Sequence, residues 1–248
     1  MTELARRSWV EQVMGLPISV LARGPRAQSE QAAEAVSLVM AELREVDARF
    51  SLYLPQSQLS QLSRGELDLD SCHPDVREVS LLCAEATSLT KGLFDPFTPS
   101  GVWDPSGLVK GWAAERASRH LAAVADLDWC LNAGGDVALL TPSGEPFGVG
   151  IQDPRDAQAV LMVLTSTTGA VATSGTAARG AHLYDPRTGA PSRSALQGVT
   201  ITGPSLTTAD VLATAAFVAS DAWRDLVAVA PGYVGHAVTA DGRVEQYP

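Results

Sequence analysis

Asp210 and Thr214 are the two residues whose types and spacing first suggest chemistry. They are four positions apart in the apolar segment 207–219, so on a helix they would share one face. A carboxylate and a hydroxyl are hard oxygen ligands of the kind that Mg²⁺ prefers, with water and substrate phosphate completing its octahedron. A structural alternative is a capping box formed by Thr207 and Asp210, with Thr214 merely facing polar neighbours. The spacing alone leaves both interpretations open.

A second group lies where a loop meets the start of a helix, at Asp104, Gly107 and Lys110. A helix N-terminus that is preceded by glycine offers backbone N–H groups to a phosphate. Lys110, in the first turn of that helix, could reach the same anion. The alternative is an ordinary capped helix that carries a solvated lysine.

His182 is the one histidine of four that lies among Ser, Thr, Asp and Arg residues. A histidine is a natural general base for a hydroxyl nucleophile, because its pKa lies near neutrality. The segment 185–189 that follows is equally typical of a plain turn, and residues 134–136 are typical of a hairpin turn. Phe94 and Asp95 could be buried filler and a capping carboxylate. Taken singly, each of these motifs has a structural explanation.

The elements that must position these residues follow from periodicity and turn residues. Residues 51–64 read as a loop or a frayed helix, and the proline-rich segment 93–107 as a structured loop. No βαβ run carries a Gly-rich fingerprint, which excludes a Rossmann domain and a P-loop. The pattern predicts an α+β fold with mainly antiparallel pairing. We expect helices at 29–50, 74–91, 108–123 and 207–219, and strands at 9–14, 17–23, 129–132, 137–141, 147–151, 159–165, 170–173, 198–202, 234–239 and 244–247. The segment 181–184 leads into the turn at 185–189.

Composition narrows the class of protein. The 248 residues suffice for one large domain or two small ones. A net charge of −10 argues against a nucleic-acid or anionic-membrane partner, although a bound metal ion could still attract a phosphate. Cys72, Cys83 and Cys130 have neither zinc nor redox spacing, which favours reduced, mostly buried thiols and a cytoplasmic location. No apolar run near the N-terminus is long enough for a signal peptide or a membrane span.

Read together and in order, the motifs resemble the FAD:protein FMN transferases, the ApbE family. The matching motifs run nearly from end to end of the chain. They are Met14-Gly15, Phe50-Ser51-Leu52-Tyr53 with Ser57, Gly92-x-Phe94-Asp95, Asp104-x-x-Gly107-x-x-Lys110-Gly111, Asn132-x-Gly134-Gly135-Asp136, Thr173-Ser174-Gly175, His182-x-x-Asp185-Pro186-x-Thr188-Gly189 and Ala209-Asp210-x-x-x-Thr214.

The resemblance implies one ApbE-like domain over residues 1–248, with mixed, mainly antiparallel sheets, flanking helices and an FAD cleft between two halves. It implies Mg²⁺-dependent transfer of FMN from FAD to a Thr hydroxyl of an acceptor flavoprotein, with release of AMP. The carbonyl of Gly107 and the side chains of Asp210 and Thr214 would bind Mg²⁺. His182, with Asp210, would be catalytic and would assist deprotonation of the acceptor hydroxyl. The implied FAD contacts are Met14, Tyr53, Phe94, Asp95, Asp104, Lys110, Ser174 and Leu183.

The sequence also departs from the family pattern. Thr176 stands where the family commonly has Asp or Asn, Thr98 is displaced by Pro96-Phe97, and the stretch between Asp95 and Asp104 is short. Two other functions therefore stay open. The same site could hydrolyse FAD to FMN and AMP with water as the nucleophile, as an FAD pyrophosphatase. Alternatively, the protein could bind or deliver FAD without catalysis.

Overall fold

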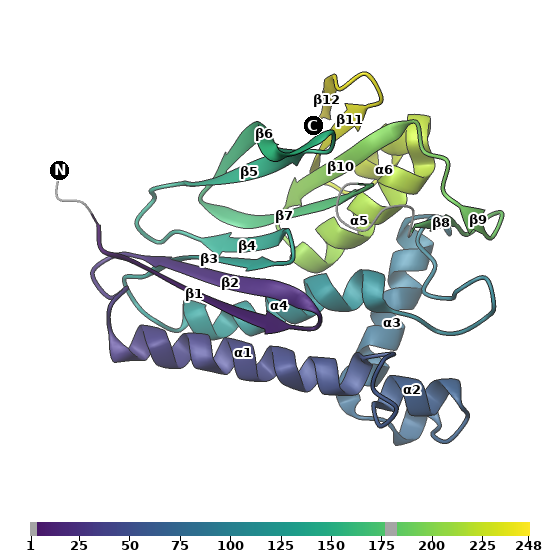
Figure 1. Cartoon of the computed structure of the whole chain (residues 1–248), viewed down its shortest axis with the longest axis horizontal. Helices are drawn as coiled ribbons and strands as arrows, with labels where there is room; N and C mark the ends of the chain where they lie inside the picture. Colours follow the sequence, from purple (N-terminus) through teal and green to yellow (C-terminus); the bar gives the residue numbers. More distant parts are fainter. Residues whose placement is uncertain (1–3, 177–182) are drawn as a thin grey trace.

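The computed structural model describes residues 4–176 and 183–248. Within them, one antiparallel sheet has the strand order β1-β2-β3-β4-β7-β10-β11-β12 (Figure 1). Two further hairpins pair β5 with β6 and β8 with β9. The strands are β1 (Arg6–Val13), β2 (Leu16–Arg23), β3 (Asp128–Ala133), β4 (Asp136–Leu140), β5 (Phe147–Asp153), β6 (Asp156–Ser166), β7 (Thr168–Gly175), β8 (Tyr184–Asp185), β9 (Ala190–Pro191), β10 (Leu196–Gly203), β11 (Val234–Thr239) and β12 (Val244–Tyr247).

The four helices expected from the periodicity are present, with somewhat different boundaries. Two short α-helices occur in addition to them. The segment 51–64 contains a helix, and a further short helix follows the helix that carries Asp210. No helix of the described residues combines the length and the apolar character that crossing a bilayer requires. The α-helices are α1 (Glu30–Phe50), α2 (Gln58–Ser63), α3 (Pro74–Leu89), α4 (Ser106–Ala122), α5 (Leu206–Ala219) and α6 (Trp223–Ala228), and the short 3₁₀ helices are η1 (Leu69–Ser71) and η2 (Ser220–Ala222).

The start of one site-bearing helix was predicted too late. Helix α4 begins at Ser106 rather than at residue 108, because the Asp104 side chain accepts a hydrogen bond from the Ser106 N–H at 3.0 Å and so starts the helix earlier. Of the segment 181–184, which is expected to lead into the turn at 185–189, residues 181 and 182 lie outside the described part of the chain, and Tyr184 begins the two-residue strand β8.

Alternation along the strands divides the sheet into two faces. Ala138 of β4 and Ala172 of β7 belong to the main core, which the helices α1, α4 and α5 cover. Their neighbours Val137, Leu139 and Val171 belong instead to a second apolar cluster, which they form with Phe147 and Ile151 of β5. The β5–β6 hairpin lies beside the sheet (Figure 1). The helix-covered face therefore receives the side chains at even-numbered positions of both strands.

One end of the sheet gathers several of the motif residues. The β1–β2 hairpin turns at Met14 and Gly15, which both have positive φ, as a two-residue primed turn requires. The β3–β4 hairpin turns at Gly134 and Gly135, and the Gly134 N–H donates to the carbonyl of Pro17 at 3.1 Å. The ladder between β2 and β3 therefore sets the two turns side by side, next to the first residue of β4.

The opposite end of β2 and β3 is held by a buried ion pair. The Arg23 guanidinium donates to Asp128 Oδ2 at 2.9 and 3.1 Å, and Ser143 donates to both oxygens of the same carboxylate. Arg23 also packs over the Phe147 ring at the start of β5. This pair ties the sheet to the β5–β6 hairpin at the end away from the two turns.

His236 of β11 predicts an acid sensitivity of the fold. It is buried, its Nδ1 has no hydrogen-bond partner among the described residues, and burial lowers its pKa below the ordinary 6.5. Below pH 6.5 the imidazole of His236 is therefore protonated in the unfolded chain but stays neutral in the folded chain. The free energy of unfolding consequently decreases as the pH falls below 6.5. We expect the melting temperature of wild type to fall more steeply between pH 7.5 and 5 than that of His236→Gln. Parallel slopes would show that His236 does not contribute.

Candidate functional site

Asp210 is buried at the contact between α4 and α5, with 2% of its surface exposed. Its Oδ2 accepts a hydrogen bond from the Gly111 N–H of α4 at 3.2 Å. The N-cap of α5 is Ser205, whose side chain accepts from the Thr208 N–H. The capping-box alternative for Thr207 and Asp210 is therefore wrong, because Asp210 lies inside the helix and is directed at α4.

Lys110 links Asp210 to a second buried carboxylate. Its Nζ lies 2.5 Å from Asp136 Oδ2 and 3.8 Å from Asp210 Oδ1. Only 20% of the Lys110 side chain is exposed, and Asp136 is 1% exposed. The alternative of a solvated lysine is therefore wrong. Asp136, the first residue of β4, reaches this place because it shares the helix-covered face with Ala138.

The charges in this group do not balance, since two carboxylates face one ammonium. Burial, followed by the negative charge of Asp136, raises the pKa of Asp210 to about 8, while Lys110 and the Gly111 N–H act in the opposite direction. A cation beside Asp210 would relieve this repulsion. No group of three or more His, Cys, Asp or Glu side chains is gathered as a metal site in the described residues. The available donors are hard oxygens, which suit Mg²⁺ better than zinc.

The predicted carbonyl ligand, Gly107, lies one helical turn before Gly111 in α4. In an α-helix the N–H of each residue is directed at the carbonyl four residues earlier, which for Gly111 is that of Gly107. The Gly111 N–H also donates to Asp210 Oδ2. By helix geometry the Gly111 N–H is therefore shared between the direction of the Gly107 carbonyl and the Asp210 carboxylate.

Thr214 lies one helical turn after Asp210 and is held by the sheet. Its Oγ1 is 3.0 Å from Ser174 Oγ on β7, and both side chains are half-buried. Ser174 shares the helix-covered face of β7 with Ala172. The structure thus brings together Lys110, Asp210, Thr214 and Ser174 from three different elements.

Gly111 is required for the close approach of α4 and α5. A Cβ at this position would lie 2.9 Å from the Leu206 carbonyl oxygen and 3.0 Å from Asp210 Cβ. We expect Gly111→Ala to destabilise the protein by about 1–3 kcal/mol through overpacking, and to displace Asp210. Urea unfolding measures the first effect. The matched control is Gly65→Ala, which lies at a positive-φ turn with open space around it and tests backbone strain without overpacking.

Three more of the predicted residues lie just before or at the start of α4. Phe94 is buried, and its ring would be 3.2 Å from a Cβ at Gly107, so it packs under the first turn of α4. Asp95 Oδ1 accepts from the Phe97 N–H, and Asp104 Oδ1 accepts from the Ser106 N–H. Phe94 therefore fits the structural alternative of a buried packing residue, and the carboxylates of Asp95 and Asp104 each accept from the backbone N–H two residues later.

The other predicted flavin-binding residues lie on elements that do not carry Asp210 or its hydrogen-bond partners. Met14 lies at the turn beside Gly134 and packs on the main core. Tyr53 is 95% exposed in the loop between α1 and α2. Leu183 packs against the core just before β8, where Tyr184 Oη donates to the Asp95 carbonyl at 3.1 Å. His182 lies outside the described residues.

Asp136 belongs to the site but was not among the predicted site residues. The sequence places it at the end of a glycine-rich hairpin turn and within the family motif Asn132-x-Gly134-Gly135-Asp136, without a role at the site. The signal that could have found it is the alternation of residues 136–140, which places residue 136 on the same face as Ala138. A carboxylate at a strand start that points into a helix-covered core needs a charged partner.

Comparison with known proteins gives one family throughout. The sequence pattern of the ApbE family matches residues 98–234, more than half of the chain. A curated relative, an FAD:protein FMN transferase of Vibrio cholerae serotype O1, is 29% identical over 144 residues. That alignment covers 54% of this chain and 42% of the relative, so the match spans less than half of the relative's length.

Solved structures share the fold over nearly the whole chain. An ApbE protein of Thermotoga maritima has a TM-score of 0.82 at 23% identity, covering 98% of this chain and 97% of its own. The flavin transferase ApbE of Vibrio cholerae has a TM-score of 0.81 at 19% identity, with the same coverage. A Pseudomonas stutzeri flavinyl transferase ApbE has 0.76 at 22% identity, covering 100% and 95%. These likenesses confirm the predicted α+β fold, and together with the sequence match they show that the chain belongs to the ApbE family.

Proposed function

We propose that this protein is a Mg²⁺-dependent FAD:protein FMN transferase. It would move FMN from FAD to a Thr hydroxyl of an acceptor flavoprotein and release AMP. The observation that supports the proposal is the group of Lys110, Asp136 and Asp210, which joins α4, β4 and α5 and has one carboxylate more than its single ammonium can neutralise. Membership of the ApbE family and the name of the curated relative support the same activity.

The donors in this group fit Mg²⁺. Asp210, Thr214 and the Gly107 carbonyl would hold the ion, and all three supply hard oxygens. When bound, Mg²⁺ supplies positive charge at a pyrophosphate, where charge develops as the phosphoanhydride is split. Asp210 must lose its proton to serve as a ligand, and its raised pKa therefore links Mg²⁺ affinity to pH.

Lys110 would contribute the second positive charge at the pyrophosphate. Its ammonium group is held 2.5 Å from Asp136 Oδ2, so its position is set before any anion arrives. Preorganised charge of this kind stabilises a transition state without reorganisation during the reaction. Asp136 would therefore act by holding Lys110 in place.

The proposed flavin contacts are the residues that the family motifs identify. Met14 lies at the same end of the sheet as Asp136, and Phe94 packs on Gly107, which supports an FAD site at this end. The exposed ring of Tyr53 is free to stack on a flat ligand. His182 would assist deprotonation of the acceptor hydroxyl. The proposed set is Met14, Tyr53, Phe94, Asp95, Asp104, Lys110, Ser174 and Leu183.

The decisive experiment incubates the protein with FAD, MgCl₂ and an unmodified flavoprotein that is known to carry FMN on threonine. We expect a fluorescent acceptor band in denaturing gels and one AMP per flavin attached, and neither with EDTA. Free FMN and AMP without acceptor would instead identify a pyrophosphatase. Tight FAD binding with no turnover in any arm would identify a binding or delivery protein and contradict the proposal.

A further inference from the structure

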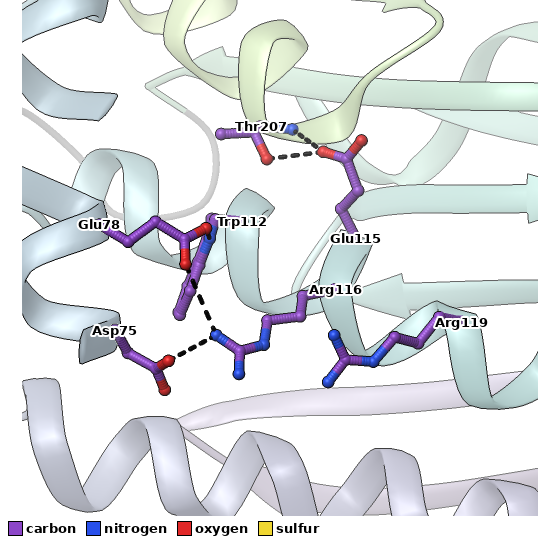
Figure 2. Close-up of a pocket in the computed structure, with 7 residues that line it drawn as sticks. All are labelled: Asp75, Glu78, Trp112, Glu115, Arg116, Arg119 and Thr207. Carbon is purple, nitrogen blue, oxygen red and sulfur yellow. Dashed lines mark hydrogen bonds and ion pairs between the residues drawn. The ribbon is translucent and has the colours of Figure 1, made fainter. Parts of the chain in front are cut away.

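Glu115 of α4 caps the N-terminus of α5. Its Oε2 accepts hydrogen bonds from Ser205 Oγ at 2.9 Å, from the Thr207 N–H at 2.8 Å and from Thr207 Oγ1 at 2.6 Å. Figure 2 shows the carboxylate reaching from α4 to Thr207. A carboxylate is favoured there, because the unpaired N–H groups and the helix dipole both present positive charge.

The carboxylate lines a cavity of about 390 Å³ between α3, α4 and the start of α5. The other charged residues there have their own partners: Arg116 pairs with Asp75 at 2.7 Å, and Glu78 Oε1 accepts from Trp112 Nε1 at 3.0 Å (Figure 2). Thr207 is the one residue of α5 among those that line the cavity. Glu115 is therefore the link between this polar cavity and the helix that carries Asp210.

The two contacts between α4 and α5 are spaced by one helical turn on each helix. In the first contact, Gly111 of α4 bonds to Asp210 of α5. In the second, Glu115 bonds to Thr207; Glu115 follows Gly111 by four residues in α4, and Thr207 precedes Asp210 by three residues in α5. Two such contacts fix both the rotation of α5 and its position along its axis relative to α4. Asp210 then lies between the Thr207 contact and the Ser174–Thr214 contact, so the direction of its carboxylate depends on both.

We propose that Glu115 is a positioning residue for cation binding at Asp210 and Thr214. This inference rests on the proposed function. In the described part of the chain, the carboxylate of Glu115 accepts its hydrogen bonds from Ser205 and Thr207, which are neither proposed cation donors nor predicted flavin contacts. It acts by holding the first turn of α5, and through it the orientation of Asp210 toward the Gly111 N–H of α4.

The test compares Glu115→Ala, Glu115→Gln and the control Glu78→Gln, each as the full chain. Glu78 lines the same cavity without contacting α5. MgCl₂ is titrated calorimetrically in the presence of FAD, and amide hydrogen exchange is followed at Thr207 and Thr208. We expect Glu115→Ala to weaken Mg²⁺ binding by about tenfold, as partners that orient metal ligands do, and to speed exchange at both amides. Glu115→Gln keeps an acceptor oxygen and should lose less, and Glu78→Gln should match wild type.

The outcomes separate the two proposals. If wild type binds no Mg²⁺ with FAD present, the proposed function fails. If wild type binds Mg²⁺ and Glu115→Ala binds it equally well, the positioning role alone is overturned, even when the melting temperature falls, because Glu115 is then only structural. If Glu115→Ala does not fold, Glu115→Gln decides: partial loss of Mg²⁺ affinity supports the role, and wild-type affinity with faster exchange overturns it.

Discussion

Replacing Asp210 by asparagine is expected to abolish Mg²⁺-dependent FMN transfer while the fold persists. Asparagine has nearly the same volume, and its side-chain oxygen can still accept from the Gly111 N–H. It lacks the negative charge that a hard cation requires. Partners that only orient a metal ligand are worth about 10- to 100-fold, so losing the ligand itself should cost about 100-fold or more. The rate of AMP release at saturating FAD, measured over a MgCl₂ series, gives the size of the effect.

The same substitution, Asp210→Asn, should raise the stability of the protein although it abolishes the transfer activity. The pKa of Asp210 rises from 3.8 to about 8 on folding, so between these pH values the folded chain keeps a proton that the unfolded chain has lost. Stability therefore falls as pH rises through this window, and an uncharged residue escapes the loss. We expect Asp210→Asn to melt higher than wild type at pH 9, by a larger margin than at pH 6, in metal-free buffer. A variant that melts lower yet transfers FMN normally would refute the metal assignment.

Replacing Asp128 by alanine should give the largest loss of stability, about 3–5 kcal/mol. The substitution leaves the Arg23 guanidinium buried without its counter-charge, and it removes the acceptor for Ser143. Breaking one side of a buried ion pair costs this much because an uncompensated charge stays in the protein interior. Urea unfolding with wild type as the reference measures it.

The control for this substitution is Glu66→Ala, which removes an ion pair with Arg64 at the protein surface. Exposed pairs contribute little, so no measurable change is expected. Because Asp128 lies at the end of β3 away from the Gly134 turn, the folded fraction of Asp128→Ala should bind Mg²⁺ like wild type. Weaker Mg²⁺ binding by that fraction would show that the two ends of the sheet are linked.

The predictions from sequence were most accurate where the signal is local. The face shared by Asp210 and Thr214 follows from helical spacing, and the turns at Met14-Gly15 and Gly134-Gly135 follow from glycine. The start of α4 was placed too late, because Ser106-Gly107 resembles loop sequence and the capping role of Asp104 depends on its rotamer. The six-residue helix α6 was missed, since so short a segment has too few turns to show a period.

The rest of the site depends on contacts between distant parts of the chain. Asp136 meets Lys110 only because β4 passes under α4, and Glu115 meets Thr207 only because α4 and α5 pack closely at Gly111. Periodicity within one segment carries no information about such pairs. The charge of Glu115 on an exposed-looking helix face is typical of a solvated residue, and its capping role appears only in three dimensions.

The path of the chain between β4 and β7 has a consequence for how this protein can diversify. Leu140 and Thr168 are direct partners in the ladder, and the Thr141 N–H donates to the Thr167 carbonyl at 2.8 Å. The segment that contains β5 and β6 therefore leaves and re-enters the main sheet at adjacent residues, and β4 stays paired with β7. Since the entropy of closing a loop grows slowly with its length, the distal part of this segment can lengthen or shorten at little cost, provided that Val137 and Val171 stay covered and that Ser143 and Phe147 keep their contacts with Asp128 and Arg23. The distal hairpin is a variable module attached to a fixed sheet.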